Sequence, residues 1–396
     1  MKVYLIAGEP SGDRLGAALM AGLRQLAPEE VEFHGVGGPL MQAEGLDSLF
    51  PMQELSVMGI AEVLPKYFHL KRRIRETAAD ALAIDPAALI TIDSPDFCLR
   101  VAALVRASRP RLRTIHYVAP SVWAWRPGRA AKMARVIDHV LALLPFEPPY
   151  MTAAGMTCDF VGHPVVSEPR ASVAEAAAFR EAVGAGHGPL ILALPGSRTG
   201  EISRLAPVIG DVLGRAKAVL PTARVVVPTL RSVAGLVRDH GAAWPIPPLI
   251  VEDPAARRAA FAAADVALAA SGTVSLELAA NAVPMVIAYD MNWLTMRLMQ
   301  RMARVDTVTL VNLVSETRAV PEFLGSNCRG DLIAPALLRL MADGPERQAQ
   351  ETAMALTMVR LGEGGVPPGL RAARSVLSRL GKGSAALPDP AAAKDA

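Results

Sequence analysis

Near the middle of the chain, a short apolar run is followed by a loop rich in glycine and serine and then by an amphipathic segment. Leu190–Leu194 is apolar, and residues 195–198, PGSR, separate it from a segment that opens with Glu201 and carries apolar residues at helical spacing. This pattern predicts a buried strand, a tight turn and an amphipathic helix. Backbone N–H groups at such a helix start stabilise an anion, and Arg198 adds a planar cation suited to phosphate oxygens. The turn is a candidate diphosphate site, with an ordinary surface turn and a solvated arginine as the alternative.

The same pattern opens the chain. Residues 3–7 are apolar, Gly8, Ser11 and Gly12 follow them, and a helix is predicted from about Asp13. Both openings are followed by alternating apolar runs and amphipathic segments, which indicates strands alternating with helices. We therefore expect an α/β fold of two tandem Rossmann-like, doubly wound domains that face each other across a cleft.

The same pattern places the remaining elements. Further strands are predicted at 32–36, 88–92, 113–118, 139–144 and 159–161, and then at 223–227, 249–251, 266–269, 284–288 and 307–311. The Ala-rich stretch 168–188 is predicted to connect the halves. The expected organisation is an N-terminal Rossmann-like domain over 1–168, a second one over 189–345, helices within 346–380 and a disordered, low-complexity tail over 381–396.

Composition narrows the class of protein. The chain has 396 residues, of which 52% are hydrophobic, which is enough for two cores. A net charge of +3 with 5% aromatic residues gives no indication of a nucleic-acid partner. Three cysteines without a C-x-x-C pair favour reduced thiols in a cytoplasm. The short apolar N-terminal run does not resemble a signal peptide, and no charge-free run is long enough to predict a transmembrane helix.

Ligands of open α/β sheets bind at the carboxyl ends of the strands, so the loops there indicate the chemistry. The loops of the first half carry the carboxylates of Glu9, Asp13, Asp93 and Asp96, whereas those of the second half carry glycine, serine, threonine and Arg198. Carboxylates repel a diphosphate, so we expect the anion in the second domain and a general base in the first. A sugar hydroxyl that attacks an activated anomeric carbon needs both.

Two observations refine this expectation. The sequence contains neither an Asp-x-Asp triplet nor an HExxH motif, so no metal and no cofactor is predicted. Glu277 lies one turn into the helix that is predicted after Thr273. Its carboxylate is suited to a nucleoside ribose or, alternatively, to the dipole of that helix.

Several short motifs occur together and in order over residues 2–340. They include AGEPSGD (7–13), IDSPDF (92–97), HYVAPSVWAWRPGR (116–129), LPGSR (194–198) and SGTVSLE (271–277). Their combination resembles the lipid-A-disaccharide synthases. The resemblance implies a metal-independent, inverting glycosyltransferase of the GT-B type. Its expected substrates are a UDP-2,3-diacylglucosamine donor and a 2,3-diacylglucosamine 1-phosphate acceptor, joined through a β-1,6 linkage with release of UDP, in lipid A biosynthesis.

The resemblance also assigns roles to residues. Asp93 matches the family's catalytic carboxylate, Asn312 matches a position important for activity, and Asp13 or Asp96 remain alternatives for the base. The expected UDP-binding residues are Gly196, Ser197, Arg198, Ser271, Gly272, Thr273 and Glu277. Those expected on the acceptor side are Ser11, Gly12 and Asp96.

Acylated substrates imply contact with a membrane. Residues 55–75 combine apolar side chains with a basic cluster, as an interfacial anchor does, although a core-facing helix with a solvated basic end is the alternative. The expected membrane contacts are Val57, Met58, Ile60, Val63, Leu64, Phe68, Arg72 and Arg73. A second stretch, 293–305, is predicted as core or as part of an acyl groove. We therefore expect a peripheral protein on the cytoplasmic face of the inner membrane.

Other interpretations remain open from the sequence. Another UDP-sugar enzyme of the same architecture, such as an epimerase or a peptidoglycan glycosyltransferase, would share the two-domain pattern. A regulator that binds nucleotide sugars without chemistry would need Arg198 but not Asp93. The C-terminal helices are expected either to return to the first domain of the same chain or to exchange into a partner of a homodimer.

Overall fold

The protein is described by a computed structural model that covers residues 1–55, 63–290 and 305–382, with the backbone alone for 63–67. The chain divides into two compact units. Unit 1 comprises Met1–Ser167 together with Gly364–Ala396, and unit 2 comprises Glu168–Glu363. The division falls at the start of the predicted connector, and the C-terminal segment belongs to the first unit. The predicted tail 381–396 lies almost wholly outside the described residues.

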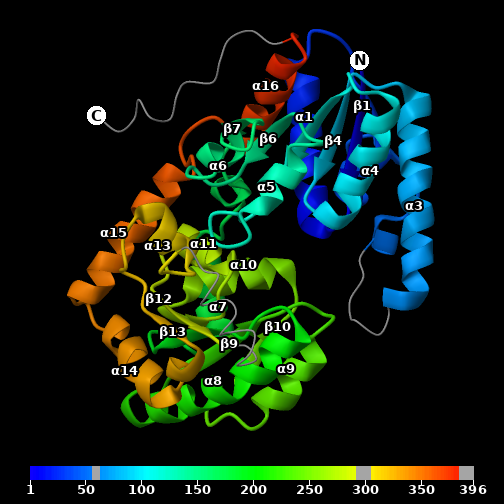
Figure 1. Ribbon diagram of the computed structural model, residues 1–396. Helices are drawn as coiled ribbons and strands as arrows, with labels where there is room; N and C mark the ends of the chain where they lie inside the picture. Colours follow the sequence, from blue (N-terminus) through cyan, green and yellow to red (C-terminus); the bar gives the residue numbers. More distant parts are fainter. Residues whose placement is uncertain (56–62, 291–304, 383–396) are drawn as a thin grey trace. The chain divides into compact units, whose positions relative to one another are not determined.

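A parallel sheet forms the centre of unit 1. Its seven described strands follow the order β3-β2-β1-β4-β5-β6-β7. The strands are β1 (Lys2–Ala7), β2 (Glu32–Val36), β3 (Asp47–Ser48), β4 (Ala88–Ile92), β5 (Arg113–Tyr117), β6 (His139–Ala142) and β7 (Thr157–Phe160). The helices are α1 (Pro10–Leu26), α2 (Pro39–Ala43), α3 (Val63–Ile84), α4 (Pro95–Ser108), α5 (Gly128–Met133), α6 (Pro148–Thr152) and α16 (Pro368–Arg379). Figure 1 shows α3 and α4 beside each other and α16 beside α1.

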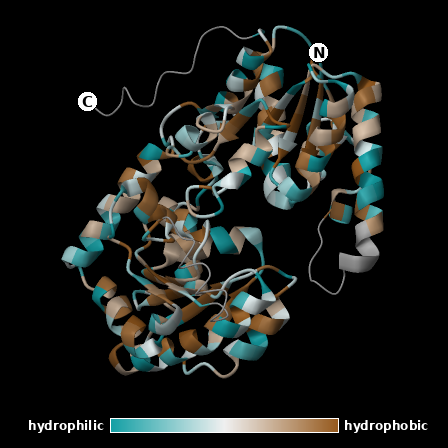
Figure 2. Cartoon of the chain, in the orientation of Figure 1, coloured by the Kyte–Doolittle hydropathy of each residue, from teal (hydrophilic) through white to brown (hydrophobic). Residues whose placement is uncertain are grey.

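The two faces of this sheet bury separate cores because side chains alternate along a strand. Val3 and Leu5 of β1 pack with residues of α1 and α16, whereas Tyr4 and Ile6 pack with residues of α3 and α4. Both faces are therefore covered, and the central strands β1 and β4 are apolar along most of their length (Figure 2).

The C-terminal helix α16 returns to unit 1 of the same chain. It approaches α1 closely, since a Cβ atom at Gly22 would lie 2.7 Å from the Gly369 carbonyl oxygen. Farther along, α16 contacts the sheet. Buried His139 of β6 lies 2.8 Å from the Ser375 hydroxyl, which donates a hydrogen bond to Asp159 of β7 at 2.7 Å. Of the helices expected within 346–380, α16 thus packs on unit 1 of the same chain, whereas α15 (Pro345–Arg360) belongs to unit 2.

Unit 2 holds a second parallel sheet. Its six described strands follow the order β10-β9-β8-β11-β12-β13. They are β8 (Leu190–Leu194), β9 (Arg224–Pro228), β10 (Pro248–Val251), β11 (Val266–Ala269), β12 (Met285–Tyr289) and β13 (Glu322–Leu324). The helices are α7 (Val173–Ala182), α8 (Thr199–Val219), α9 (Ala234–Gly241), α10 (Pro254–Ala263), α11 (Val274–Ala280), α13 (Leu310–Ser315), α14 (Gly330–Met341) and α15 (Pro345–Arg360). The predicted α/β fold with two parallel sheets is confirmed.

The prediction of a strand at 307–311 is wrong, because α13 begins within this stretch. Its β-branched residues suggest a strand, but their backbone N–H groups are taken by a side chain. The Glu322 carboxylate accepts hydrogen bonds from the backbone of Val308 at 3.1 Å and of Thr309 at 2.8 Å. The last strand of the sheet is β13 instead. A smaller correction concerns α1, which begins at Pro10 rather than near Asp13.

Candidate active site

The turn between β4 and α4 has an unusual backbone. Asp93 and Ser94 have φ angles of 52° and 43°, which is the left-handed region that residues other than glycine rarely adopt. Each such residue costs of order 1–3 kcal/mol and tends to occur at functional sites. Pro95 then opens α4, and the Ser94 carbonyl accepts hydrogen bonds from the N–H groups of its first turn. The turn therefore holds Asp93 at the carboxyl edge of the sheet.

Asp93 lines a pocket of about 530 Å³ in unit 1. Its walls come from the β1–α1 loop, the β4–α4 turn and the facing sides of α3 and α4. The lining residues are Glu9, Leu55, Leu70, Lys71, Ile74, Asp93, Ser94, Pro95, Asp96, Phe97 and Arg100. Three carboxylates, two cations and an apolar wall thus share one cavity, which suits a polar head group attached to an apolar chain.

Asp96 meets Asp93 in this pocket, but the other acceptor-side candidates do not line it. Asp13 is 3% exposed, and its carboxylate accepts hydrogen bonds at 2.9–3.0 Å from the backbone N–H groups of Gly38, Leu40 and Met41. Gly12 is buried against β1 and β4, and Ser11 is exposed in the first turn of α1. The geometry favours a structural role for Asp13, since its carboxylate is already fully engaged.

A further carboxylate braces the loops at the same edge of the sheet. Glu147 is buried and accepts hydrogen bonds from the backbone N–H groups of Leu143 and Leu144 and from the indole of Trp123. Burial raises the pKa of Glu147 to about 7. Glu147 lies in a loop that follows a strand, but no sequence motif assigned it a role.

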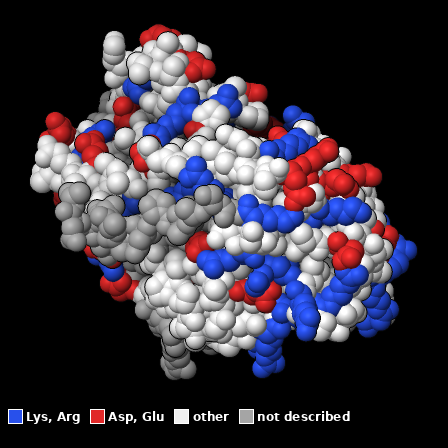
Figure 3. Space-filling view, turned by 90° about the horizontal axis from the view of Figure 1, so that it is seen from above, with Lys and Arg blue, Asp and Glu red and all other residues white. Residues whose placement is uncertain are grey.

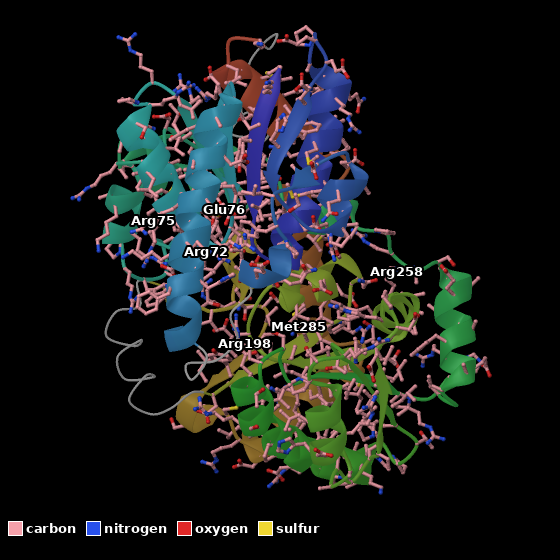
Figure 4. All side chains as sticks on the ribbon, turned by 90° about the vertical axis from the view of Figure 1, so that its right-hand side faces the viewer. Arg72, Arg75, Glu76, Arg198, Arg258 and Met285 are labelled. Atoms are coloured by element: carbon pink, nitrogen blue, oxygen red, sulfur yellow. The ribbon has the colours of Figure 1, made fainter. Side chains whose placement is uncertain are left out.

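In unit 2, the turn between β8 and α8 binds a carboxylate from the first turn of α8. Glu201 accepts a hydrogen bond from the Ser197 N–H at 3.2 Å and pairs with the Arg198 guanidinium at 2.9 Å. Gly196 has a φ of 112°, and a Cβ atom there would lie 2.6 Å from the Glu201 carboxylate. The Arg198 side chain is 81% exposed and lies at the start of α8 (Figure 4). The turn thus binds an anion already, and that anion is Glu201.

The second glycine-containing turn of unit 2 joins β11 to α11. The Ser271 hydroxyl donates to the Val308 carbonyl at 3.2 Å, and Gly272 has a φ of 147° with open space where a Cβ atom would stand. Thr273 precedes the first residue of α11. Glu277, on that helix, accepts a hydrogen bond from Arg257 of α10 at 2.6 Å, so its carboxylate is held in one orientation.

Asn312 is 1% exposed and lies on α13, not on a strand. Its amide donates to the Val320 carbonyl at 2.9 Å and accepts from the Val320 N–H at 3.0 Å. Both ends of the side chain are therefore engaged in fastening α13 to the segment before β13. This geometry favours a positioning role.

The proposed membrane segment is described only in part. Val57, Met58 and Ile60 lie outside the described residues, as do most of residues 293–305, and so do the side chains of Val63 and Leu64. Phe68 on α3 is 76% exposed, and Arg72 is exposed on the same helix (Figure 4). Arg73 differs, because its guanidinium donates hydrogen bonds to Glu54 and Glu76 at 2.8 Å each. The guanidinium also lies over the Phe50 ring, and the side chain is only 14% exposed. Arg73 is the least available of the three to a membrane.

Charges are mixed on the surface. On the face shown in Figure 3, Lys and Arg side chains are spread over the right-hand half, with Asp and Glu among them. Within the described residues, no helix is long and apolar enough to cross a membrane. The same residues contain no group of three or more His, Cys, Asp or Glu side chains placed to hold a metal ion.

A model of the lipid-A-disaccharide synthetase family matches residues 3–365. The chain belongs to the lipid-A-disaccharide synthase family. A lipid-A-disaccharide synthase of Ruegeria pomeroyi is 64% identical over 388 residues, which cover 96% of each chain. One from Rhodospirillum centenum is 46% identical over 96% of this chain and 95% of its own. The resemblance noted in the sequence is therefore confirmed, and the protein is a glycosyltransferase by family.

Solved structures of other enzymes share the fold of this member of the lipid-A-disaccharide synthase family. A UDP-GlcNAc 2-epimerase from Neisseria meningitidis, bound to UDP-GlcNAc, superposes with a TM-score of 0.66 over 96% of this chain and all of its own, at 12% identity. A UDP-GlcNAc 2-epimerase from Methanocaldococcus jannaschii, in complex with UDP-GlcNAc and UDP, gives a TM-score of 0.60 over 96% of this chain and 99% of its own, at 11% identity. At this identity the likeness concerns the fold alone, whereas the family match favours a synthase over an epimerase or a peptidoglycan glycosyltransferase.

Proposed function

We propose that the protein transfers 2,3-diacylglucosamine from UDP to the 6-hydroxyl of 2,3-diacylglucosamine 1-phosphate. The new bond is a β-1,6 linkage, and the products are the lipid A disaccharide 1-phosphate and UDP. One observation within the chain supports this most: in a member of this family, the matching carboxylate, Asp93, stands on a strained turn in a pocket large enough for a sugar.

Asp93 is the general base in this proposal. Its carboxylate takes the proton of the acceptor 6-hydroxyl while the oxygen attacks the anomeric carbon of the donor. The bond from that carbon to the diphosphate breaks on the opposite face, so the configuration inverts and UDP leaves with the bonding electrons. Asp96 lies in the same pocket and is exposed. We therefore assign it to hydrogen-bonding the acceptor sugar.

Unit 2 binds the departing UDP in this proposal. Arg198 and the N–H groups of the turn at 196–198 take the diphosphate, with the turn at Ser271, Gly272 and Thr273 beside the nucleotide and Glu277 on the ribose. The Glu201 carboxylate, which now accepts from Ser197 and pairs with Arg198, is displaced by the diphosphate. A charge that develops on the leaving group thus meets donors that are already oriented toward an anion.

The acyl chains place the reaction at a membrane surface. A buried methylene contributes about 0.8 kcal/mol, so a chain of about ten methylenes is retained in the bilayer by roughly 8 kcal/mol. Phe68 and Arg72 offer an exposed ring and a cation on one helix, which suits docking on an anionic inner-membrane surface.

Replacing Phe68 by serine and Arg72 by glutamate is expected to shift the protein from liposome pellet to supernatant. Unchanged pelleting, compared with a Lys132→Glu control on α5, would remove this helix as the anchor.

The decisive experiment is a detergent-micelle assay with both acylated substrates and EDTA, comparing wild type with Asp93→Ala and Arg198→Ala. We expect disaccharide from wild type and none from either variant, while calorimetry shows that the Asp93 variant still binds UDP. Asp96→Asn removes another carboxylate of the same pocket, and because Asp96 is assigned to binding the acceptor, this variant should raise KM for the acceptor but still form disaccharide. If the Asp93 variant keeps full activity, the assignment of the base is wrong. If wild type binds UDP but forms no disaccharide, the proposed reaction is wrong.

A further inference from the structure

The Asp93 pocket contains two cations that the proposed reaction has not used. Lys71 projects from α3 and Arg100 from α4, and both line the cavity. Arg100 follows Asp96 by four residues on α4, so the two share one face of that helix. The pocket therefore changes from acidic, at the β4–α4 turn, to basic, one helical turn farther along.

Within the described residues, these two cations do not form ion pairs with the carboxylates of the pocket. Among the described residues, neither Lys71 nor Arg100 makes an ion pair within 4 Å, although Glu9, Asp93 and Asp96 line the same cavity. Other arginines of the same helices do form pairs: Arg73 binds Glu54 and Glu76, and Arg106 binds Asp138 at 2.7 Å. Two exposed, unpaired cations in a cavity of this size are suited to an incoming anion.

We propose that Lys71 and Arg100 form an anion subsite that binds the phosphate of the sugar 1-phosphate acceptor. This inference rests on the proposed function. In a hexose 1-phosphate, the primary hydroxyl and the phosphate lie on opposite sides of the ring oxygen. Carboxylates repel the phosphate, so it lies toward Lys71 and Arg100, and the hydroxyl then faces Asp93. The subsite thereby fixes which end of the acceptor reaches the base.

The test removes charge from the protein and from the ligand separately. Wild type and the Lys71→Ala/Arg100→Ala variant are assayed with 2,3-diacylglucosamine 1-phosphate and with 2,3-diacylglucosamine, which lacks the phosphate. We expect the variant to raise KM for the phosphorylated acceptor about 10- to 100-fold, in the range of hydrogen bonds to charged groups. Its KM for the unphosphorylated acceptor and for the donor should be unchanged, so the preference for the phosphate disappears.

The control variant is Lys132→Ala/Arg135→Ala, which removes the same charge from exposed positions of unit 1 outside the pocket. It should keep the full preference, and Lys71→Arg/Arg100→Lys should restore most of it. An unchanged preference in Lys71→Ala/Arg100→Ala, with circular dichroism like that of wild type, overturns the subsite.

A second measurement separates this inference from the proposed reaction. If wild type makes no disaccharide from either acceptor, the proposed function fails, and titration with glucosamine 1-phosphate decides about the subsite. Saturable binding that is lost in Lys71→Ala/Arg100→Ala and kept in the control supports it. Equal binding by all three proteins refutes it.

Discussion

The turn between β4 and α4 in unit 1 and the turn between β8 and α8 in unit 2 hold their carboxylates in opposite ways. In unit 1, the turn at Asp93 and Ser94 is strained and leaves its carboxylate in a pocket with two cations that form no ion pair with any residue that the structure describes. In unit 2, the turn at 196–198 uses a glycine for its positive φ and holds a carboxylate of its own helix. The comparison shows that the turn of unit 1 has a strained backbone and leaves its carboxylate in a pocket, whereas the turn of unit 2 avoids this strain with a glycine and binds a carboxylate of α8.

We expect the largest effect from substitutions that distinguish the proposed catalytic carboxylate of unit 1, Asp93, from the structural one, Asp13. Asp93→Asn should lower kcat by about 10²- to 10⁴-fold, as loss of a general base does. Its free energy of unfolding should change by less than about 0.5 kcal/mol. Asp13→Ala should do the reverse, because the buried N–H groups of Gly38 and Met41 lose their acceptor at about 1–3 kcal/mol each, and the half-buried N–H of Leu40 loses it too. Urea unfolding and initial rates distinguish the two, and a stable, inactive Asp13→Ala would contradict the structural role.

Acid should destabilise unit 1 before unit 2. Burial lowers the pKa of His116, His139 and His163 to about 4, below the value of about 6.5 in an unfolded chain. Between these values the unfolded state binds more protons, so stability falls as pH falls from about 6.5 toward 4, by up to about 1.4 kcal/mol per pH unit for each histidine.

Glu147 acts in the opposite direction, because its pKa is raised to about 7. A raised carboxyl pKa adds stability on acidification, but one carboxyl offsets only part of the effect of three histidines. Hydrogen exchange at pH 7.5 and pH 5 should show a larger loss of protection in unit 1 at the lower pH, once each rate is divided by the intrinsic amide rate, which itself falls with pH. An equal loss of protection in both units would refute the assignment, and His139→Asn should reduce the difference.

The occupied turn of unit 2 gives a smaller, paired effect on UDP binding. Arg198→Ala should weaken UDP binding about 10- to 100-fold, since a charged hydrogen bond to the diphosphate is lost. Glu201→Gln should tighten it several-fold, because a neutral amide competes less well for Arg198 and the Ser197 N–H. Calorimetry with UDP measures both. Weaker binding in Glu201→Gln would show that this carboxylate shapes the turn rather than occupying it.

The smallest effect concerns packing rather than charge. In Gly369→Ala, the new methyl group would lie 2.6 Å from the Ala18 carbonyl, so α16 must shift away from α1. We expect a loss of about 1–3 kcal/mol of unfolding free energy. Gly235→Ala on α9 is the control, because nothing lies within 4 Å of its Cβ position, and it should be neutral or slightly stabilising. Equal stability of the two variants would remove the close contact as a constraint.

The sequence predicted the fold well because the central strands, such as β4, β8 and β12, are nearly continuous apolar runs bounded by loop residues. It failed at 307–311, where β-branched residues give the signal of a strand but the Glu322 carboxylate binds their N–H groups. Such a capture depends on a residue more than ten positions away and leaves no local signal. The family motifs placed Asp93 and Arg198 on strand-end turns, as the structure has them.

What the sequence did not supply was the state of each charged group. Asp13, in the first turn of α1, and Asp93, in the turn after β4, both follow neighbouring strands, yet one is saturated by backbone N–H groups and the other lies in a pocket. Arg100 was overlooked because lone charges on helices are common, Lys71 was counted only in the basic cluster of residues 55–75, and Glu201 only as the start of a helix. The spacing of four residues between Asp96 and Arg100 was the one available signal.

The return of α16 to unit 1 affects the order in which the chain is made. Unit 1 needs residues from both ends of the sequence, so on the ribosome its N-terminal segment must wait while residues 168–363 are translated. At about 5–20 residues per second, the wait is about 10–40 s. During this time the face of α1 that carries Leu19 and Leu23 lacks the cover of Ala373 and Val376. Unit 2 is continuous and can fold as it emerges, so the unit synthesised second is the first that can be completed.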